Sequence, residues 1–256
     1  MAALEIELVP CLRDNYAYLV RDADDGVCAV VDPSEAAPVR VALAARGWRL
    51  THILNTHHHP DHTGGNAQLK REFDAKVIGP GKDRERIPAL DIGVDETTPF
   101  TLGSHPARVL EIPAHTSAHI AFAFDADGAV FTGDTLFAMG CGRLFEGTPE
   151  MMWRSLSKLV ALADSMRVYC GHEYTLNNGR FALTLEPGNG DLVARMREVE
   201  TLRASDAPTI PSTIGLEKKT NPFLRPDSPE IRRTLNMADA SNVEVFAEMR
   251  TRKDVF

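Results

Sequence analysis

The sequence predicts an α+β protein in which a larger domain of mixed strands and helices precedes a small helical domain. Through the first 172 residues, short stretches alternate apolar and polar side chains as strands do, beginning with Leu4, Ile6 and Leu8. Stretches with helical spacing lie between them, and after His172 only helical spacing remains. We therefore predict two domains, at residues 1–173 and 174–256.

The composition excludes several classes of function. The chain has 256 residues and a formal net charge of −8, which argues against nonspecific binding to nucleic acid or to anionic membranes. No apolar run approaches the roughly 20 residues of a membrane span, and the first residues lack the basic and apolar regions of a signal peptide. The four cysteines are scattered without CxxC spacing, which favours reduced thiols and a cytoplasmic location.

The first domain should contain strands interleaved with helices. Ser34 is placed to cap a helix that ends at Gly47, a residue that suits a C-terminal cap. Residues 80–107 carry proline, glycine and many charges, and we predict them to be mostly loop. The other predicted strands lie at residues 16–20, 27–31, 50–56, 76–79, 109–112, 120–124, 129–132 and 168–171, and further helices at 66–73 and from 149.

The second domain should be helical throughout. Its periodic segments lie at residues 181–185, 192–202, 231–237 and 243–249. A proline-rich connection at residues 207–225 separates the second of these segments from the third.

The stretch at residues 56–66, THHHPDHTGGN, carries the strongest chemical signal in the chain. It places His57, His59, Asp61 and His62 directly after a predicted strand, so that several side chains can be aimed at one point. Neutral imidazole and carboxylate are the usual ligands of zinc, iron and manganese. A His-rich loop tip without a function is the plain alternative, but it would not account for the aspartate, the two glycines and the preceding strand.

Further residues of metal-ligating type stand at the ends of later strands. They are His115, Asp134 and His172. With the four residues of the motif they make seven candidates, whereas one catalytic ion takes about three protein ligands and a water. The number of candidates therefore predicts two metal ions with a carboxylate between them.

Three residues near these candidates have less certain roles on sequence alone. Asp32, at a strand end, could orient a metal-ligating imidazole or cap the turn before Pro33. His119 could support the site behind the ligands or simply pack in the core. His58 points away from its two neighbours if the segment is extended, so we leave it out of the ligand set.

These motifs resemble a known family. The pattern HxHxDH at residues 57–62 is the signature of the metallo-β-lactamase superfamily, which implies an αβ/βα sandwich. Several longer motifs are more selective, and with them the whole chain resembles the glyoxalase II (hydroxyacylglutathione hydrolase) family. These motifs are FTGDTLF at residues 131–137, GCGRLFEGT at 140–148, YCGHEYT at 169–175 and NPFLR at 221–225.

The resemblance implies a ligand set and a cofactor. One metal ion would be held by His57, His59 and His115, the other by Asp61, His62 and His172, with Asp134 bridging both. It implies two divalent ions, with zinc expected and iron or manganese also suited to these ligands. Asp61, His62 and Asp134 would be the catalytic residues.

The resemblance also implies a reaction. Hydroxide generated at the two metal ions would hydrolyse S-D-lactoylglutathione, a 2-hydroxyacylglutathione thioester, to glutathione and D-lactate, the second step of methylglyoxal detoxification. Residues 174–256 would bind the glutathione part, and a monomer is expected. The implied substrate-binding residues are Arg143, Phe145, Tyr174, Arg250 and Lys253.

The chain departs from the family pattern at three of these positions. Arg143 stands where many members have lysine, Phe145 where members often have tyrosine, and Ala118 where glycine is usual. Glycine at such a position often reflects a positive φ or a close backbone approach, which alanine resists. Because both neighbouring histidines remain, we expect a modest local shift and retained activity.

Other classes of function remain as alternatives. A persulfide dioxygenase of the same superfamily would use a single iron and fewer ligands. A β-lactam or phosphodiester hydrolase would not need the helical C-terminal domain. A noncatalytic metal-binding module would keep the ligands without the reaction, and Arg250 and Lys253 would then belong to a solvated basic tail.

Overall fold

The computed structural model describes residues 2–256, which form two compact units. The first unit comprises residues up to Glu111 together with Ala118–Gly133. The second comprises Ile112–Ser117 together with Asp134–Phe256. The short segment Ile112–Ser117, which carries His115, therefore belongs with the second unit. Among residues 2–256, no helix is long and apolar enough to cross a bilayer.

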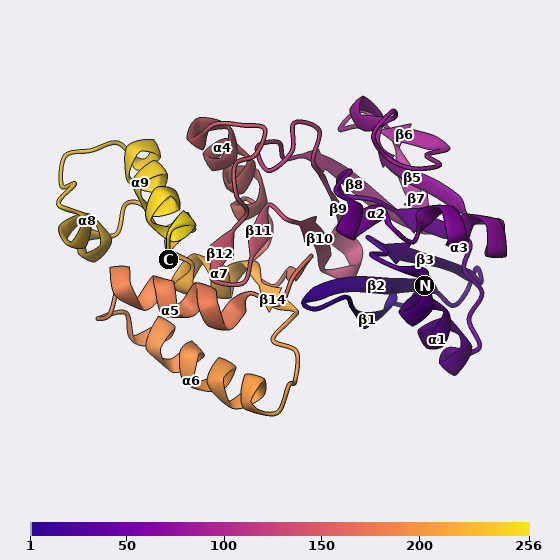
Figure 1. Ribbon diagram of the computed structural model, residues 1–256, viewed down its shortest axis with the longest axis horizontal. Coiled ribbons are helices and arrows are strands. Elements are labelled where there is room, and N and C mark those ends of the chain that lie inside the picture. The colour runs from indigo at the N-terminus through magenta and orange to yellow at the C-terminus, as the bar shows by residue number, and fades with distance from the viewer. Residues whose placement is uncertain (1) are drawn as a thin grey trace. The chain divides into compact units, whose positions relative to one another are not determined.

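A six-stranded mixed sheet forms one layer of the first unit (Figure 1). The first three strands are antiparallel and the last three run parallel to the third. Because β3 and β4 are parallel neighbours, the residues that follow them, Asp32 and Asn55, meet at the same edge of the sheet. The strands are β1 (Glu5–Cys11), β2 (Asn15–Asp22), β3 (Val27–Val31), β4 (His52–Leu54), β5 (Lys76–Pro80) and β6 (Ile92–Val94).

Helices α1 (Ala36–Arg46) and α3 (Asn66–Phe73) cover one face of this sheet. Alternate strand residues such as Ala17 and Leu19 form a buried cluster with Leu43 and other side chains of these helices. Successive side chains point to opposite faces of the sheet, and β2 and β3 are buried at consecutive positions, so both faces of the sheet can be covered.

The ends of α1 test two predictions from the sequence. Gly47 is confirmed as the C-terminal cap, with a φ of 63° and an N–H that donates to the carbonyls of Ala44 and Leu43. The prediction that Ser34 caps the helix was wrong. The N-cap is Glu35, and no side chain accepts a hydrogen bond there.

Four antiparallel strands form the second layer of the first unit. They pack against the uncovered face of the first sheet, where the rings of Tyr18 and Phe131 lie 5.6 Å apart. The predicted strands at residues 120–124 and 129–132 are confirmed and pair as a hairpin, and Gly128 at its turn has a φ of 61°. The strands are β7 (Phe100–Leu102), β8 (His105–Glu111), β9 (Ile120–Phe124) and β10 (Ala129–Gly133).

The second unit is mainly helical. Helix α4 begins at Pro149 as predicted, and Thr148 caps it, because its side chain accepts a hydrogen bond of 3.3 Å from the Met151 N–H. Trp153 of α4 then packs against Phe246 of α9, with ring centroids 6.3 Å apart. The helices are α4 (Pro149–Val160), α5 (Thr175–Leu185), α6 (Gly190–Ala204), α7 (Ile214–Thr220), α8 (Pro229–Leu235) and α9 (Asn242–Asp254), and the short strands are β11 (Leu136–Phe137), β12 (Gly140–Cys141), β13 (Arg167–Cys170) and β14 (Ser212–Thr213).

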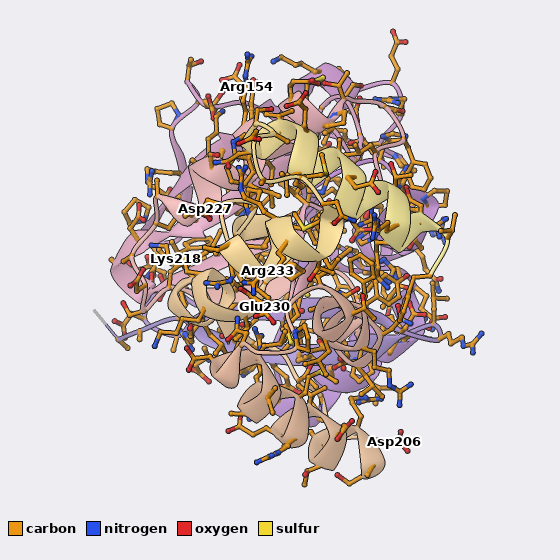
Figure 2. All side chains as sticks on the ribbon, turned by 90° about the vertical axis from the view of Figure 1, so that its left-hand side faces the viewer. Arg154, Asp206, Lys218, Asp227, Glu230 and Arg233 are labelled. Atoms are coloured by element: carbon orange, nitrogen blue, oxygen red, sulfur yellow. The ribbon has the colours of Figure 1, made fainter. Side chains whose placement is uncertain are left out.

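Polar side chains tie the helices of the second unit to its loops. Arg195 and Glu217, both buried, form an ion pair of 2.6 Å, and Glu217 also accepts a 2.8 Å hydrogen bond from the Met139 N–H. Lys218, labelled in Figure 2, is an exposed counterpart that pairs with Asp164 at 2.6 Å. The buried pair fixes α6 and α7 against the segment that follows Asp134.

Two stretches contain more structure than the sequence suggested. Residues 80–107 are mostly loop, as predicted, but β6, β7 and the start of β8 also lie there. The proline-rich connection at residues 207–225 contains β14, α7 and the short 3-10 helix Pro222–Leu224. These elements are two to seven residues long, too short to show a hydrophobic period.

Candidate metal centre

The histidine motif begins one residue after β4 and turns at once into the short helix α2 (Pro60–Thr63). Gly64 follows it in a place where a side chain would collide with the carbonyl oxygen of Ser34. The close approach holds the motif against the segment that follows β3. Glycine is required at this position for space rather than for an unusual φ.

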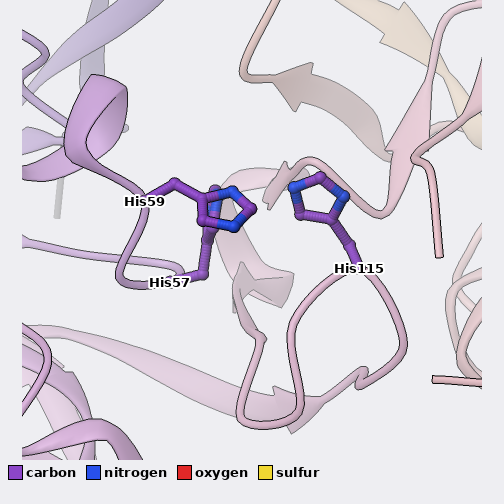
Figure 3. Close-up of side chains that lie close together, drawn as sticks. All are labelled: His57, His59 and His115. Atoms are coloured by element: carbon purple, nitrogen blue, oxygen red, sulfur yellow. The ribbon is translucent and has the colours of Figure 1, made fainter. Parts of the chain in front are cut away.

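The first unit gathers the four predicted ligands of this motif into one cluster. His57 Nε2 lies 3.1 Å from His59 Nδ1, and Figure 3 shows the rings of both residues. The rings of His57 and His62 are 4.2 Å apart, and His62 Nε2 lies 3.5 Å from Asp61 Oδ2. Three imidazoles and one carboxylate from six consecutive residues thus converge on one region.

Asp32 orients an imidazole of this cluster. This was one of the two roles that the sequence allowed for Asp32. Its Oδ2 lies 3.2 Å from His62 Nδ1. A carboxylate can only accept, so Nδ1 carries the proton and neutral His62 presents an unprotonated Nε2 toward Asp61. Two acceptors that face each other at this distance suit a cation between them, and the carboxylate on the far nitrogen is the usual outer partner of a metal-ligating histidine.

The second unit gathers the other three predicted ligands. Asp134 Oδ2 lies 3.4 Å from His115 Nε2 and 3.2 Å from His172 Nε2. His115 Nδ1 lies 2.9 Å from the carbonyl oxygen of Arg143, to which it must donate. Neutral His115 therefore also presents an unprotonated nitrogen toward a carboxylate oxygen. The donor chemistry of both clusters fits divalent metal ions of the zinc, iron or manganese type.

The remaining histidines of these segments do not join the predicted ligands. His119 is fully buried and stacks on His57, with centroids 4.6 Å apart and ring planes at 18°, which agrees with a packing role. His58 bonds through Nδ1 to Asp83 Oδ2 at 3.0 Å. This hydrogen bond to Asp83 agrees with the omission of His58 from the predicted ligand set.

Three predicted substrate-binding cations lie close together in the second unit. Asp254 Oδ1 is 3.0 Å from Arg250 Nη2 and 3.6 Å from Arg143 Nε. Lys253 donates to Asn177 Oδ1, and its ammonium lies 5.6 Å from the centre of the Phe181 ring. Burial, and then the positive charges of Arg250 and Arg143, lower the pKa of Lys253 to about 8. This cationic cluster has the charge needed to attract an anionic ligand.

Two aromatic side chains of the second unit contact predicted ligands. Tyr174 stacks on His172, and the ring of Phe145 lies 5.2 Å from that of His115. Phe145 remains 60% exposed, so most of its surface is available to a substrate.

Sequence reasoning missed several residues that support these groups. Asn15 donates through Nδ2 to Asp61 Oδ2 at 3.1 Å, and Asn177 holds Lys253. Thr56 bonds to both Asp32 and His57. Thr56 belongs to a motif that was recognised, but the residue type at a motif position does not reveal which atom the side chain will bond.

Comparison with known proteins covers the chain from end to end. The family model described as Metallo-beta-lactamase superfamily matches residues 12–172. The model described as Hydroxyacylglutathione hydrolase C-terminus matches residues 173–256. The hydroxyacylglutathione hydrolase of Methylococcus capsulatus is 55% identical over 253 residues, which is 99% of both chains. The chain belongs to the hydroxyacylglutathione hydrolase family.

Other relatives agree with this family and with the predicted fold class. The hydroxyacylglutathione hydrolase of Rhizobium meliloti is 50% identical over 256 residues, all of both chains. The solved structure of ETHE1 from Myxococcus xanthus aligns with a TM-score of 0.69 at 23% identity, covering 98% of this chain and 90% of that one. TTHA1623, solved in a di-iron-bound form, aligns with a TM-score of 0.60 at 25% identity, covering 84% and 98%. The metallo-β-lactamase αβ/βα sandwich with a C-terminal helical domain is thereby confirmed.

Proposed function

We propose that this member of the hydroxyacylglutathione hydrolase family hydrolyses S-D-lactoylglutathione and related 2-hydroxyacylglutathione thioesters to glutathione and the free acid. The reaction is the second step of methylglyoxal detoxification. The observation that carries the proposal is the full-length match to relatives named hydroxyacylglutathione hydrolase at 49–55% identity. The two ligand clusters supply residues for a metal-dependent hydrolysis.

The proposed cofactor is a pair of divalent metal ions, with zinc expected. His57, His59 and His115 would hold one ion, Asp61, His62 and His172 the other, and Asp134 would bridge them. The bridging role is supported by Asp134 Oδ2, which lies within 3.4 Å of an Nε2 atom of both His115 and His172. When bound there, two ions would lower the pKa of water toward about 7 and polarise a substrate carbonyl. The di-iron form of TTHA1623 supports a site for two metals.

The catalytic roles proposed for Asp61, His62 and Asp134 follow from their positions. Asn15 is hydrogen-bonded to Asp61, and Asp32 is hydrogen-bonded to His62. These contacts hold the Asp61 carboxylate and the His62 imidazole so that an oxygen of one faces a nitrogen of the other. Neither cluster presents an obvious further acid. A thiol has a pKa near 8.5, so a thiolate leaves without the protonation that an amide nitrogen needs. The residues present therefore suit a thioester better than an amide.

The proposed substrate-binding residues are those of the second unit. Glutathione carries two carboxylates and one ammonium, and a protein of net charge −8 repels it at long range. Arg143, Arg250 and Lys253 supply the local positive charge that binding requires, while Tyr174 and Phe145 supply ring surface. We retain residues 174–256 as the glutathione-binding domain and residues 1–173 as the catalytic domain.

Two further properties belong to the proposal. The four cysteines are buried and none of them is in a disulfide, which supports a reducing, cytoplasmic environment. We infer a monomer as the working form.

The test is an assay of S-D-lactoylglutathione hydrolysis by the purified protein, with metal analysis of the same sample. Glutathione persulfide with oxygen, and a chromogenic cephalosporin, serve as control substrates for the dioxygenase and β-lactamase alternatives. We expect fast thioester hydrolysis and little turnover of either control. Turnover of a control substrate in place of the thioester would contradict the proposal, and a metal-loaded protein that turned over none would indicate a noncatalytic module.

A further inference from the structure

Thr56 lies fully buried between β4 and the first proposed ligand, His57. Its hydroxyl oxygen is 2.6 Å from Asp32 Oδ2 and 3.0 Å from His57 Nδ1. Its N–H donates a 2.8 Å hydrogen bond to Asp32 Oδ1. Both oxygens of Asp32 are therefore engaged by one residue, and that residue also reaches the imidazole.

Counting protons in this network determines how the His57 ring is protonated. Asp32 accepts from the Thr56 N–H, from the Thr56 hydroxyl and from His62, as an ionised carboxylate does. A hydroxyl has a single proton, and the Thr56 proton is used toward Asp32. The hydroxyl oxygen must then accept from His57, so Nδ1 carries the His57 proton and Nε2 carries the lone pair. His57 Nε2 is the nitrogen that faces His59 Nδ1 at 3.1 Å.

The space for this hydroxyl depends on a glycine in another strand. Gly133, at the end of β10, has a φ of 47°, and a Cβ there would collide with Thr56 Oγ1. The same Cβ would lie 2.8 Å from the His119 ring, which stacks on His57. The absence of a side chain at Gly133 thus leaves room for the Thr56 hydroxyl in this orientation.

We propose that Thr56 is a positioning residue that relays the Asp32 carboxylate to His57 and fixes the protonation and orientation of that imidazole for metal binding. One carboxylate then sets two proposed ligands, His62 by direct contact and His57 through the threonine hydroxyl. The proposal rests on the proposed function for its metal site, but the hydrogen bonds on which it stands lie entirely within the first unit.

A different reading of the same residues is that Asp32 is itself a ligand. Asp32, His57 and His62 each offer an atom within 4.8 Å of the others. A metal there would have to displace the hydrogen bonds from the Thr56 hydroxyl and from His62 Nδ1. The network that Asp32 makes therefore favours a role behind the ligands over a role as one of them.

The experiment compares zinc affinity in the zinc-loaded full chain and two variants, by competition with a chromogenic chelator. Thr56→Val removes the hydroxyl at nearly constant shape, and Thr56→Ser keeps it. Loss of an outer hydrogen-bond partner of a metal ligand typically weakens binding 10–100-fold. We expect such a loss for Thr56→Val at one ion and a change within about threefold for Thr56→Ser. Equal affinity in Thr56→Val and the wild type would overturn the proposal.

The matched control is Thr51→Val. Thr51 precedes β4, and its hydroxyl bonds to the Cys28 carbonyl at 2.8 Å and to His52 Nδ1 at 2.8 Å. The substitution therefore removes comparable hydrogen bonds, but beside His52, a histidine that is not a proposed ligand. We expect unchanged zinc affinity. A loss equal to that of Thr56→Val would show a general effect of weakened packing around β4 and would overturn the positioning role.

A second measurement uses the wild-type protein and therefore does not depend on the folding of any variant. In the zinc-loaded wild type with ¹⁵N-labelled histidine, we expect the ring proton of His57 on Nδ1, protected from exchange. A proton on Nε2 would overturn the proposal. Neither readout uses thioester hydrolysis, so a protein that failed to hydrolyse the thioester would refute the proposed function and leave this inference to be decided by zinc and by the His57 proton.

Discussion

The Tyr174 ring stacks on the His172 imidazole, with ring centroids 4.6 Å apart and ring planes that differ by 5°. The contact limits the rotation of the His172 imidazole, whose Nε2 lies 3.2 Å from Asp134 Oδ2. Tyr174 therefore has two separable parts, a ring that supports a proposed metal ligand and a hydroxyl that we propose to bind the substrate.

Replacing Tyr174 should separate these two parts. Tyr174→Phe keeps the stacked ring, so we expect full metal content and a KM raised about 2- to 10-fold, the equivalent of one hydrogen bond of 0.5–1.5 kcal/mol. Tyr174→Leu removes the stack as well, and we expect metal content and kcat to fall. Steady-state kinetics with metal analysis of both variants checks this, and loss of metal in Tyr174→Phe would count against the separation.

The KM of the thioester should rise with pH because of Lys253. Its pKa is lowered to about 8, first by burial and then by Arg250 and Arg143. A bound carboxylate favours the charged ammonium, so this contribution to binding is complete below that pKa and is lost as the pH rises through it. Between about pH 7 and about pH 9 we expect KM to rise by up to about tenfold, one pKa unit.

The matched variant for this pH effect is Lys253→Arg. Arginine stays charged throughout this range, so the rise in KM should disappear while the low-pH value changes little. Kinetics across the range in a constant-ionic-strength buffer provide the measurement. The same rise in Lys253→Arg would assign the pH effect to another group.

Arg250 should matter for stability as well as for binding. Its side chain is buried, donates a 2.7 Å hydrogen bond from Nη1 to the Cys141 carbonyl, and lies over the Phe223 ring. We expect Arg250→Ala to lower the free energy of unfolding by about 1.5–3 kcal/mol, the loss of a charge-assisted hydrogen bond. Arg252→Ala, which removes an exposed ion pair, should change it by less than about 0.5 kcal/mol. Urea denaturation of both variants measures the two changes in the free energy of unfolding.

Ala118→Gly should change the rate little. The family pattern has glycine at this position, but Ala118 is not among the described non-glycine residues with positive φ, and alanine there carries no such strain. A small change in kcat/KM is therefore the expected result. A gain of about a hundredfold, or 2.7 kcal/mol of barrier, would show that glycine is needed here for a reason other than φ.

The sequence predicted which residues gather in each cluster better than it predicted the groups that support them. His57, His59, Asp61 and His62 could be found because a strand, a motif and a turn coincide in one short stretch. The contact of Asp32 with His62 could only be offered as one of two options, since it depends on β3 and β4 being parallel neighbours. The role of Thr56 depends on two distances of 2.6 and 3.0 Å, which no pattern of residue types encodes.

The differences between the predicted and the observed elements have a similar physical origin. α7 is seven residues long and buries Glu217, so its pattern looks polar although an ion pair with Arg195 compensates the charge. β6 and β7 have three residues each, and their neighbours in the sheet make them strands. Ser34 precedes a helix by two positions and has a cap-forming side chain, but the chain turns so that Glu35 takes the N-cap position.

The central claim is that two metal ions act together in thioester hydrolysis, and one measurement tests it most directly. Protein stripped of metal is titrated with zinc while the rate of S-D-lactoylglutathione hydrolysis is followed. We expect the rate to reach its maximum only near two equivalents of zinc, because the seven proposed ligands exceed the three or so that one catalytic ion takes. A full rate at one equivalent, or no hydrolysis at any amount of zinc, would contradict it.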